Sequence, residues 1–71
     1  MTRPVIESIE DESGDRCLDL IRLGDRWSWV ECRRDPEDAH VWRRLYPPRG
    51  DFADRAAALA DARREVEWLG A

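Results

Sequence analysis

The sequence contains no lysine, asparagine or glutamine, and its single histidine is His40. All twelve basic residues are therefore arginines, a bias that we attribute mainly to a GC-rich genome of bacterial type. A lone histidine without a positioned nucleophile or carboxylate partner does not indicate a general base. No glycine-rich phosphate loop is present either. These absences argue against an enzyme, and we expect neither catalysis nor a cofactor.

Cysteine and long hydrophobic runs are equally scarce. Cys17 and Cys32 do not supply the three or four regularly spaced ligands that a zinc site requires, so we expect no metal. No apolar run approaches the length of a transmembrane helix, and the acidic N-terminal stretch lacks the hydrophobic region of a signal peptide. We therefore expect a cytoplasmic protein without a membrane partner, in which both cysteines stay reduced.

The chain is rich in charged residues and in tryptophan. Charged residues make up 39% of the 71 residues, and the net charge is −4. Four tryptophans supply apolar bulk that disordered chains lack. A chain of this size buries only roughly 60% of its unfolded surface, so it usually gains added stability from a disulfide, a metal or a partner subunit. The negative charge disfavours nucleic acid as a partner.

Short runs of β-branched and aromatic residues, separated by turn residues, predict four strands. We expect them at about residues 5–10, 17–23, 26–33 and 41–46. Gly24-Asp25 has the order that a two-residue hairpin loop prefers, with glycine first. Pro47-Pro48 marks the end of the fourth strand.

Residues from about 52 to 69 are rich in alanine, leucine, arginine and glutamate and predict one α-helix. Asp51 is its expected N-cap, and Asp61 falls on the polar side of the helix. We therefore predict one α+β domain over residues 1–71. Its small antiparallel meander of three to four strands carries one C-terminal α-helix on one face.

The proposed hairpin has large apolar side chains on both faces. With Gly24-Asp25 as the loop, one face carries Leu18, Leu20, Trp27 and Trp29, and the other carries Cys17, Ile21, Leu23, Val30 and Cys32. The alanine-rich helix needs bulky residues beneath it, so we expect it to cover the first face. The second face then remains as a protein interface, because contiguous exposed apolar surface usually marks one. The alternative is that charged neighbours and the chain's own N-terminus cover it, and a one-residue slip of register would exchange the faces.

These patterns favour a non-catalytic protein–protein interaction module, such as a small phage-borne or accessory regulator, that binds a protein partner or a second copy of itself. The alternative is single-stranded nucleic-acid binding, because arginines and aromatic rings gather over two strands and a loop. The residues of that surface are Arg33, Arg34, Trp42, Arg43, Arg44 and Tyr46. Neighbouring arginines on a strand point to opposite faces, however, which divides the surface.

Overall fold

A regular β-hairpin is the centre of the fold. The computed structural model describes residues 5–38 and 40–70. Strands β2 (Arg16–Leu23) and β3 (Arg26–Arg34) are joined by the loop Gly24-Asp25, and Leu20 lies opposite Trp29. Gly24 has a φ of 63°, which is the positive value that the first loop position requires. This confirms the predicted loop and register.

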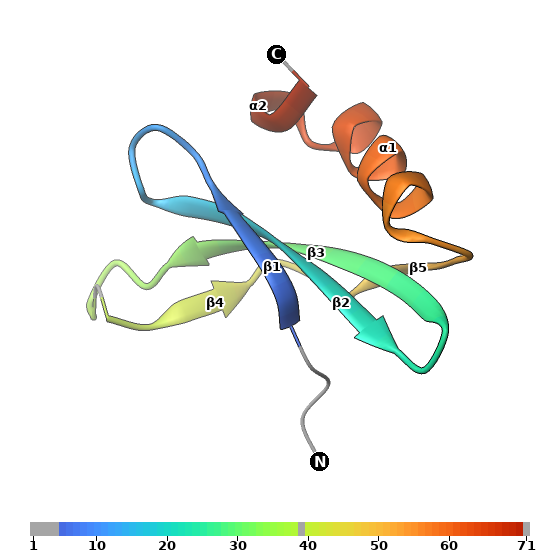
Figure 1. Ribbon diagram of the computed structural model, residues 1–71. Helices are drawn as coiled ribbons and strands as arrows, with labels where there is room; N and C mark the ends of the chain where they lie inside the picture. Colours follow the sequence, from blue (N-terminus) through green and yellow to red (C-terminus); the bar gives the residue numbers. More distant parts are fainter. Residues whose placement is uncertain (1–4, 39, 71) are drawn as a thin grey trace.

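Three further strands complete the antiparallel sheet (Figure 1). β1 (Val5–Glu10) pairs with β2, whereas β4 (Trp42–Arg44) and β5 (Arg49–Phe52) pair with successive parts of β3. The fourth strand is thus shorter than predicted, and β5 was missed. Pro47-Pro48 interrupts the pairing with β3 but does not end it, because Trp29 still lies opposite Arg49 and Trp27 opposite Phe52.

The helical region is shorter than predicted and is divided in two. α1 (Arg55–Glu65) begins after Asp54, whose carboxylate accepts a 2.8 Å hydrogen bond from the backbone N–H of Ala57. The prediction of Asp51 as the N-cap was therefore wrong, because β5 holds Phe52 in the sheet and the helix can start only beyond it. Val66 is extended and separates α1 from α2 (Glu67–Gly70).

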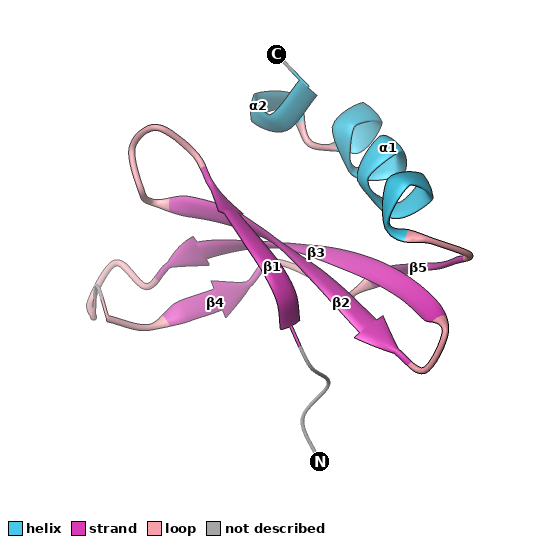
Figure 2. Ribbon diagram, viewed as in Figure 1, coloured by secondary structure: helices cyan, strands magenta, loops and turns pink. Residues whose placement is uncertain are grey.

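Both helices lie on the same side of the sheet (Figure 2). The core between the two layers contains Leu18, Leu20, Trp29, Ala58, Ala62 and Val66. This is the face that the sequence assigned to the helix. The α+β class, with an antiparallel sheet and a C-terminal helix packed on it, is therefore confirmed.

The opposite face of the hairpin is not the exposed apolar surface that we predicted. Cys17, Ile21, Val30 and Cys32 form a second buried cluster, against which Trp42 and Tyr46 pack. Leu23 alone among the five predicted interface residues is exposed, at 58%. The alternative hypothesis was that the N-terminus covers this face. It depends on residues 1–4, which lie outside the described residues.

Side chains of neighbouring strands surround this second cluster. Side chains from β1, β2 and β4 line one concavity of about 320 Å³ on this face, with Val5 and Trp42 on its walls and Cys17 in its lining. Glu10 of β1 and Arg34 of β3 form an ion pair at 3.6 Å across the intervening β2. Long side chains of β1 and β3 thus meet over β2 on the face that holds the second cluster.

Candidate interaction surfaces

Cys17, Asp19 and Cys32 form a hydrogen-bonded group in the second cluster. Their Sγ and carboxylate atoms lie within 4.8 Å of one another. Ser8 donates a 2.6 Å hydrogen bond to Asp19, and the two thiols donate to the same carboxylate at 3.6 and 3.7 Å. Burial, followed by the charge of Asp19, raises the pKa of Cys32 to about 11 and also raises the pKa of Cys17. The thiols therefore stay protonated near neutral pH and act as donors that hold Asp19, and this group is no evidence of a metal site.

The predicted arginine–tryptophan surface is divided between the two faces of the sheet. Arg34 is paired in register with Trp42, and its guanidinium lies 4.3 Å from the centroid of the indole ring. Arg44 lies beside Cys32 on that same face. Arg33 and Arg43 are paired in register on the other face, which also carries the helices.

Several of these side chains also have partners within the chain. Asp35 accepts a hydrogen bond from the backbone N–H of Glu37 and forms an ion pair with Arg43, and these contacts, the first most strongly, lower the pKa of Asp35. The Tyr46 hydroxyl donates to Glu31 at 3.2 Å, and its ring packs edge-on against Trp29. The six residues thus do not form one continuous cationic surface. Nucleic-acid binding by this chain stays an untested prediction.

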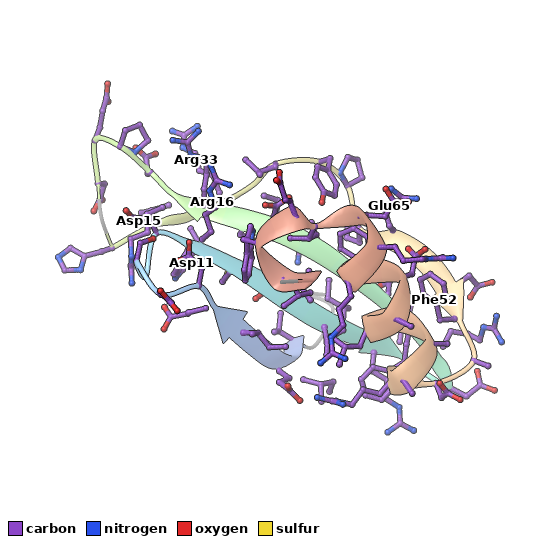
Figure 3. All side chains as sticks on the ribbon, turned by 90° about the horizontal axis from the view of Figure 1, so that it is seen from above. Asp11, Asp15, Arg16, Arg33, Phe52 and Glu65 are labelled. Atoms are coloured by element: carbon purple, nitrogen blue, oxygen red, sulfur yellow. The ribbon has the colours of Figure 1, made fainter. Side chains whose placement is uncertain are left out.

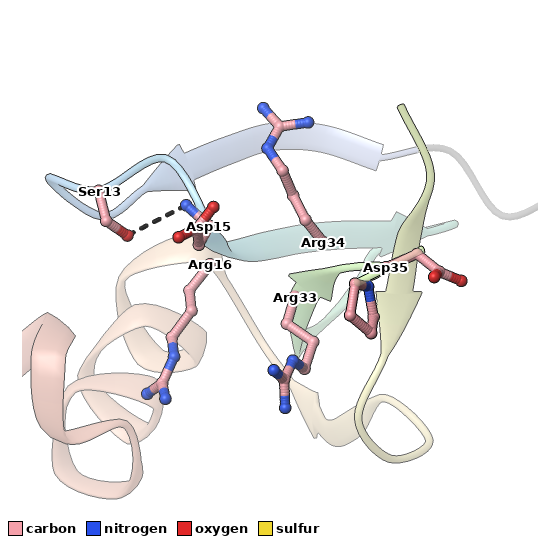
Figure 4. A pocket seen from close by; sticks show the side chains of 7 residues that line it. Ser13, Asp15, Arg16, Arg33, Arg34 and Asp35 are labelled. Carbon is pink, nitrogen blue, oxygen red and sulfur yellow. Dashed lines mark hydrogen bonds between the residues drawn. The ribbon is translucent and has the colours of Figure 1, made fainter. Parts of the chain in front are cut away.

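The structure reveals a different pair of arginines that the sequence analysis missed. Arg16 of β2 lies directly opposite Arg33 of β3. The backbone N–H of Arg34 donates to the carbonyl of Asp15 at 2.9 Å, so the neighbouring Arg16–Arg33 pair occupies a non-hydrogen-bonded position, where facing side chains come closest. Both leave the sheet on the side of the helices, whereas Arg34 points the other way (Figure 4). The hairpin register, extended to the ends of its strands, would have identified this pair.

Arg16 and Arg33, which we call the arginine pair, differ from six other arginines of the chain. Ion pairs with acidic side chains are made by Arg26, Arg34, Arg43, Arg49, Arg55 and Arg64. Within residues 5–38 and 40–70, no carboxylate forms an ion pair with either member of the arginine pair. Both side chains are exposed. Like charges directly opposite each other destabilise a sheet, and among the described residues no ion pair offsets the cost of this arrangement.

The arginine pair lines a concavity of about 550 Å³. Its other lining residues are Ser13, Asp15, Arg34, Asp35 and Pro36. Figure 3 places Arg16 and Arg33 beyond one end of the helical layer and Phe52 near the other. The concavity thus lies at the end of the sheet that the helices leave uncovered.

An apolar groove adjoins this concavity at Ser13. Its volume is about 640 Å³, and we define it by Ile9, Trp68 and Leu69. The indole of Trp68 donates a 2.9 Å hydrogen bond to Glu31 of β3, which fixes the ring against the sheet. Glu10, Asp11, Glu12 and Ser13 form the opposite rim, so three carboxylates also border the groove. The helix-side end of the sheet therefore presents apolar side chains and the arginine pair next to each other, with an acidic rim beside them.

A turn holds the rim between the groove and the arginine pair. Asp11 accepts hydrogen bonds from Ser13 Oγ and from the backbone N–H groups of Gly14 and Arg16 at 2.9 to 3.3 Å. These contacts lower the pKa of Asp11, although burial acts in the opposite direction. The turn therefore fixes Ser13 at the junction of the two concavities.

The function of this chain has to be inferred from its local geometry, because searches against protein-family models, curated proteins and solved structures found no match. Within residues 5–38 and 40–70, no helix has both the length and the apolar character needed to cross a membrane.

Proposed function

We propose that this chain is a non-catalytic protein-interaction module that binds a protein partner at the helix-side end of its sheet. The observation that carries the proposal is the arginine pair, which lacks an acidic partner in the described chain and lies beside the apolar groove. Arginine and aromatic residues are enriched in protein interfaces, where a buried apolar centre is bordered by polar groups. Trp68 and the arginine pair provide this combination.

Charge favours a protein partner over nucleic acid. The net charge of −4 repels a long polyanion, and Asp15 lies in the lining of the same concavity as the arginine pair. A protein can instead present one acidic group to the arginines and apolar groups to the groove. His40, the only histidine, is exposed in a turn, where its backbone N–H donates to Asp38. That position offers no support for a catalytic role.

The same geometry favours a partner different from the chain itself. A two-fold dimer centred on this surface would bring the arginine pairs of both copies together. That arrangement would add to the repulsion already present within each pair. We therefore extend the proposal to a heterologous partner and no longer favour self-association through Ile21 and Val30, which are fully buried.

Selection from a library of random peptides tests the proposal. The immobilised wild-type chain should enrich a set of related peptides with an apolar residue in common. Leu69→Glu, which puts a charge into the groove, should lose them. Arg63→Glu, on the exposed side of α1, should retain them. Circular dichroism of each variant checks folding, and Leu69→Ala serves as a milder groove variant. Failure to enrich any peptide, or equal binding by the groove variants, contradicts the proposal.

A further inference from the structure

We infer that the arginine pair is a carboxylate-binding site that recognises an acidic side chain of the partner, directly next to an apolar side chain held in the groove. This inference rests on the proposed interaction function and specifies the chemistry of the partner. It concerns Arg16, Arg33 and the adjoining groove of Ile9, Trp68 and Leu69.

The first support is the placement of the two guanidinium groups. Arg16 and Arg33 lie on the two strands of the most regular hairpin in the sheet, so their backbone positions are fixed relative to each other. Facing side chains of such a pair start roughly 4.5–5.5 Å apart at Cβ. Each guanidinium is a planar set of donors that matches the two oxygens of a carboxylate. One carboxylate between the two arginines can therefore receive hydrogen bonds from both.

The second support is that two arginines facing each other across a sheet are unfavourable unless an anion is bound between them. The chain has sixteen acidic residues, and acidic partners are placed beside six other arginines. The arginine pair instead combines two like charges in register, and a bound carboxylate would relieve their repulsion. A residue pair that costs stability in the free protein is the arrangement expected of a binding site rather than of a structural contact.

The acidic residues around the concavity limit the kind of anion that fits. Asp35 is already engaged by Arg43 and by the backbone N–H groups of Glu37 and Asp38. Asp15 faces the same concavity, and among the described residues it forms no ion pair. Its negative charge, together with Glu10, Asp11 and Glu12 on the rim of the groove, opposes a phosphate dianion more strongly than a singly charged carboxylate. The site is therefore suited to the side chain of glutamate or aspartate.

The third support is the distance between the cationic and apolar parts of the surface. Both concavities include Ser13 in their lining, so no other element separates them. A peptide that places an apolar side chain in the groove must then carry its acidic group within a residue or two, since an extended chain rises roughly 3.3 Å per residue. The expected recognition element is an apolar residue followed or preceded closely by an acidic residue.

Titration of the isotope-labelled chain with short synthetic peptides tests this inference by nuclear magnetic resonance. The blocked peptide Gly-Leu-Glu-Glu-Gly should shift the Nε–Hε signals of Arg16 and Arg33 and the indole signal of Trp68. The matched peptide Gly-Leu-Gln-Gln-Gly should bind at least about tenfold more weakly, because it lacks the charge that strengthens hydrogen bonds to arginine. Equal affinity for the two peptides would overturn the carboxylate site but leave the groove, and hence the proposed function, intact.

Two variants separate a binding role from a structural one. Arg16→Gln combined with Arg33→Gln should weaken binding of the glutamate peptide at least about tenfold and should also raise the midpoint of urea unfolding, because the opposed charges are removed. Arg63→Gln is the matched control and should change neither quantity. A double variant that unfolds more easily than the wild type would show that the arginines stabilise the fold, which contradicts the inference.

Two further probes identify the anion. Inorganic phosphate and a peptide in which phosphoserine replaces the first glutamate should both bind more weakly than Gly-Leu-Glu-Glu-Gly. Tighter binding of either phosphate probe would overturn the assignment to a carboxylate. The Arg33→Glu variant should prefer Gly-Leu-Lys-Lys-Gly over the glutamate peptide, and the absence of this reversal would contradict direct contact between Arg33 and the charged side chain.

Discussion

The indole Nε1 of Trp29 donates a 3.0 Å hydrogen bond to the carboxylate of Asp61 in the buried contact between β3 and α1. The helical pattern had placed Asp61 on the polar side, and this was wrong, since only 8% of the residue is exposed. Ala58 and Ala62 face the sheet and let the helix approach closely. The fully buried indole then needs an acceptor, and Asp61 supplies it.

Replacing Asp61 by alanine should lower the free energy of unfolding by about 1–3 kcal/mol, because the buried indole N–H of Trp29 would lose its acceptor. Asp61→Asn keeps an acceptor oxygen and should cost less. Arg63→Ala, on the exposed side of the same helix, should change the free energy by less than about 0.5 kcal/mol. Urea unfolding followed by tryptophan fluorescence measures all three, and equal effects of the Asp61 and Arg63 variants would contradict the role of this bond.

The same carboxylate should make stability depend on pH in the acidic range. Hydrogen bonds from Arg64 and from Trp29 lower the pKa of Asp61 from its usual 3.8. The folded protein therefore binds fewer protons than the unfolded chain just below that pH. The contribution of Asp61 is fully present above pH 3.8 and is lost as the pH falls through its lower, folded-state pKa.

Urea unfolding at about pH 6 and again at about pH 3 measures this loss. Asp61→Asn removes the titrating group and should show a smaller decrease than the wild type. Asp11 and Asp35, whose pKa values are also lowered, act in both proteins and so cancel in the comparison. An identical decrease in the two proteins would mean that Asp61 does not contribute.

Two residues of β2 test whether the second face of the sheet is a core. Ile21 is fully buried there, whereas Leu23, two positions further along the strand, is 58% exposed. Ile21→Ala should lower the free energy of unfolding by about 2–5 kcal/mol. Leu23→Ala should stay within roughly 0.5 kcal/mol. A small effect at Ile21, together with a wild-type protein that sediments as a dimer, would instead favour the interface predicted from the sequence.

The two thiols should react slowly while the chain is folded. The reactive form of cysteine is the thiolate, and burial raises the pKa of Cys32 to about 11 and also that of Cys17. Near pH 8, where an ordinary thiol reacts readily, modification by an aromatic disulfide reagent should proceed only at the rate at which the chain opens. Glutathione at the same pH and the chain in urea serve as fast controls. Rapid modification of the native protein would contradict the buried hydrogen-bonded group.

The raised thiol pKa values also predict a loss of stability in alkaline solution. Thiolates form in the unfolded chain near the usual pKa of 9.0 but only at higher pH in the folded protein. The stabilising contribution is therefore complete below pH 9.0 and declines as the pH rises through the folded-state value of about 11 for Cys32. A Cys17→Ser, Cys32→Ser protein should show a weaker decline, and an equal decline would assign it to other groups.

The hairpin was the part of the fold that local sequence patterns could predict. Glycine at the first loop position and alternating side chains define the register, and hence the side on which Trp29 lies. The same register contained the Arg16–Arg33 pair. Its members are 17 positions apart in the sequence, whereas adjacent arginines such as Arg33 and Arg34 point to opposite faces of the strand.

Features that depend on distant parts of the chain could not be predicted in this way. Asp51 and Asp54 are the same residue type, and only the pairing of Phe52 with Trp27 places the N-cap at Asp54 and not at the predicted Asp51. Val30 is fully buried in a cluster against which Trp42 and Tyr46 pack, and no local pattern encodes these contacts. The apolar groove joins Ile9 to Trp68 and therefore requires the packing of α2 beside β1.

The two irregular pairings of the sheet also affect how the protein behaves at high concentration. The register shifts between Val5 and Glu7 where β1 meets β2, and between Trp27 and Trp29 where β5 meets β3, whereas the central hairpin is regular. A flat, regular outer strand would offer its free backbone groups to a neighbouring molecule and could start an amyloid-like stack. Bulges twist such a strand and shorten its straight part. We therefore expect the chain to resist fibril formation, although its strands are rich in tryptophan and β-branched residues.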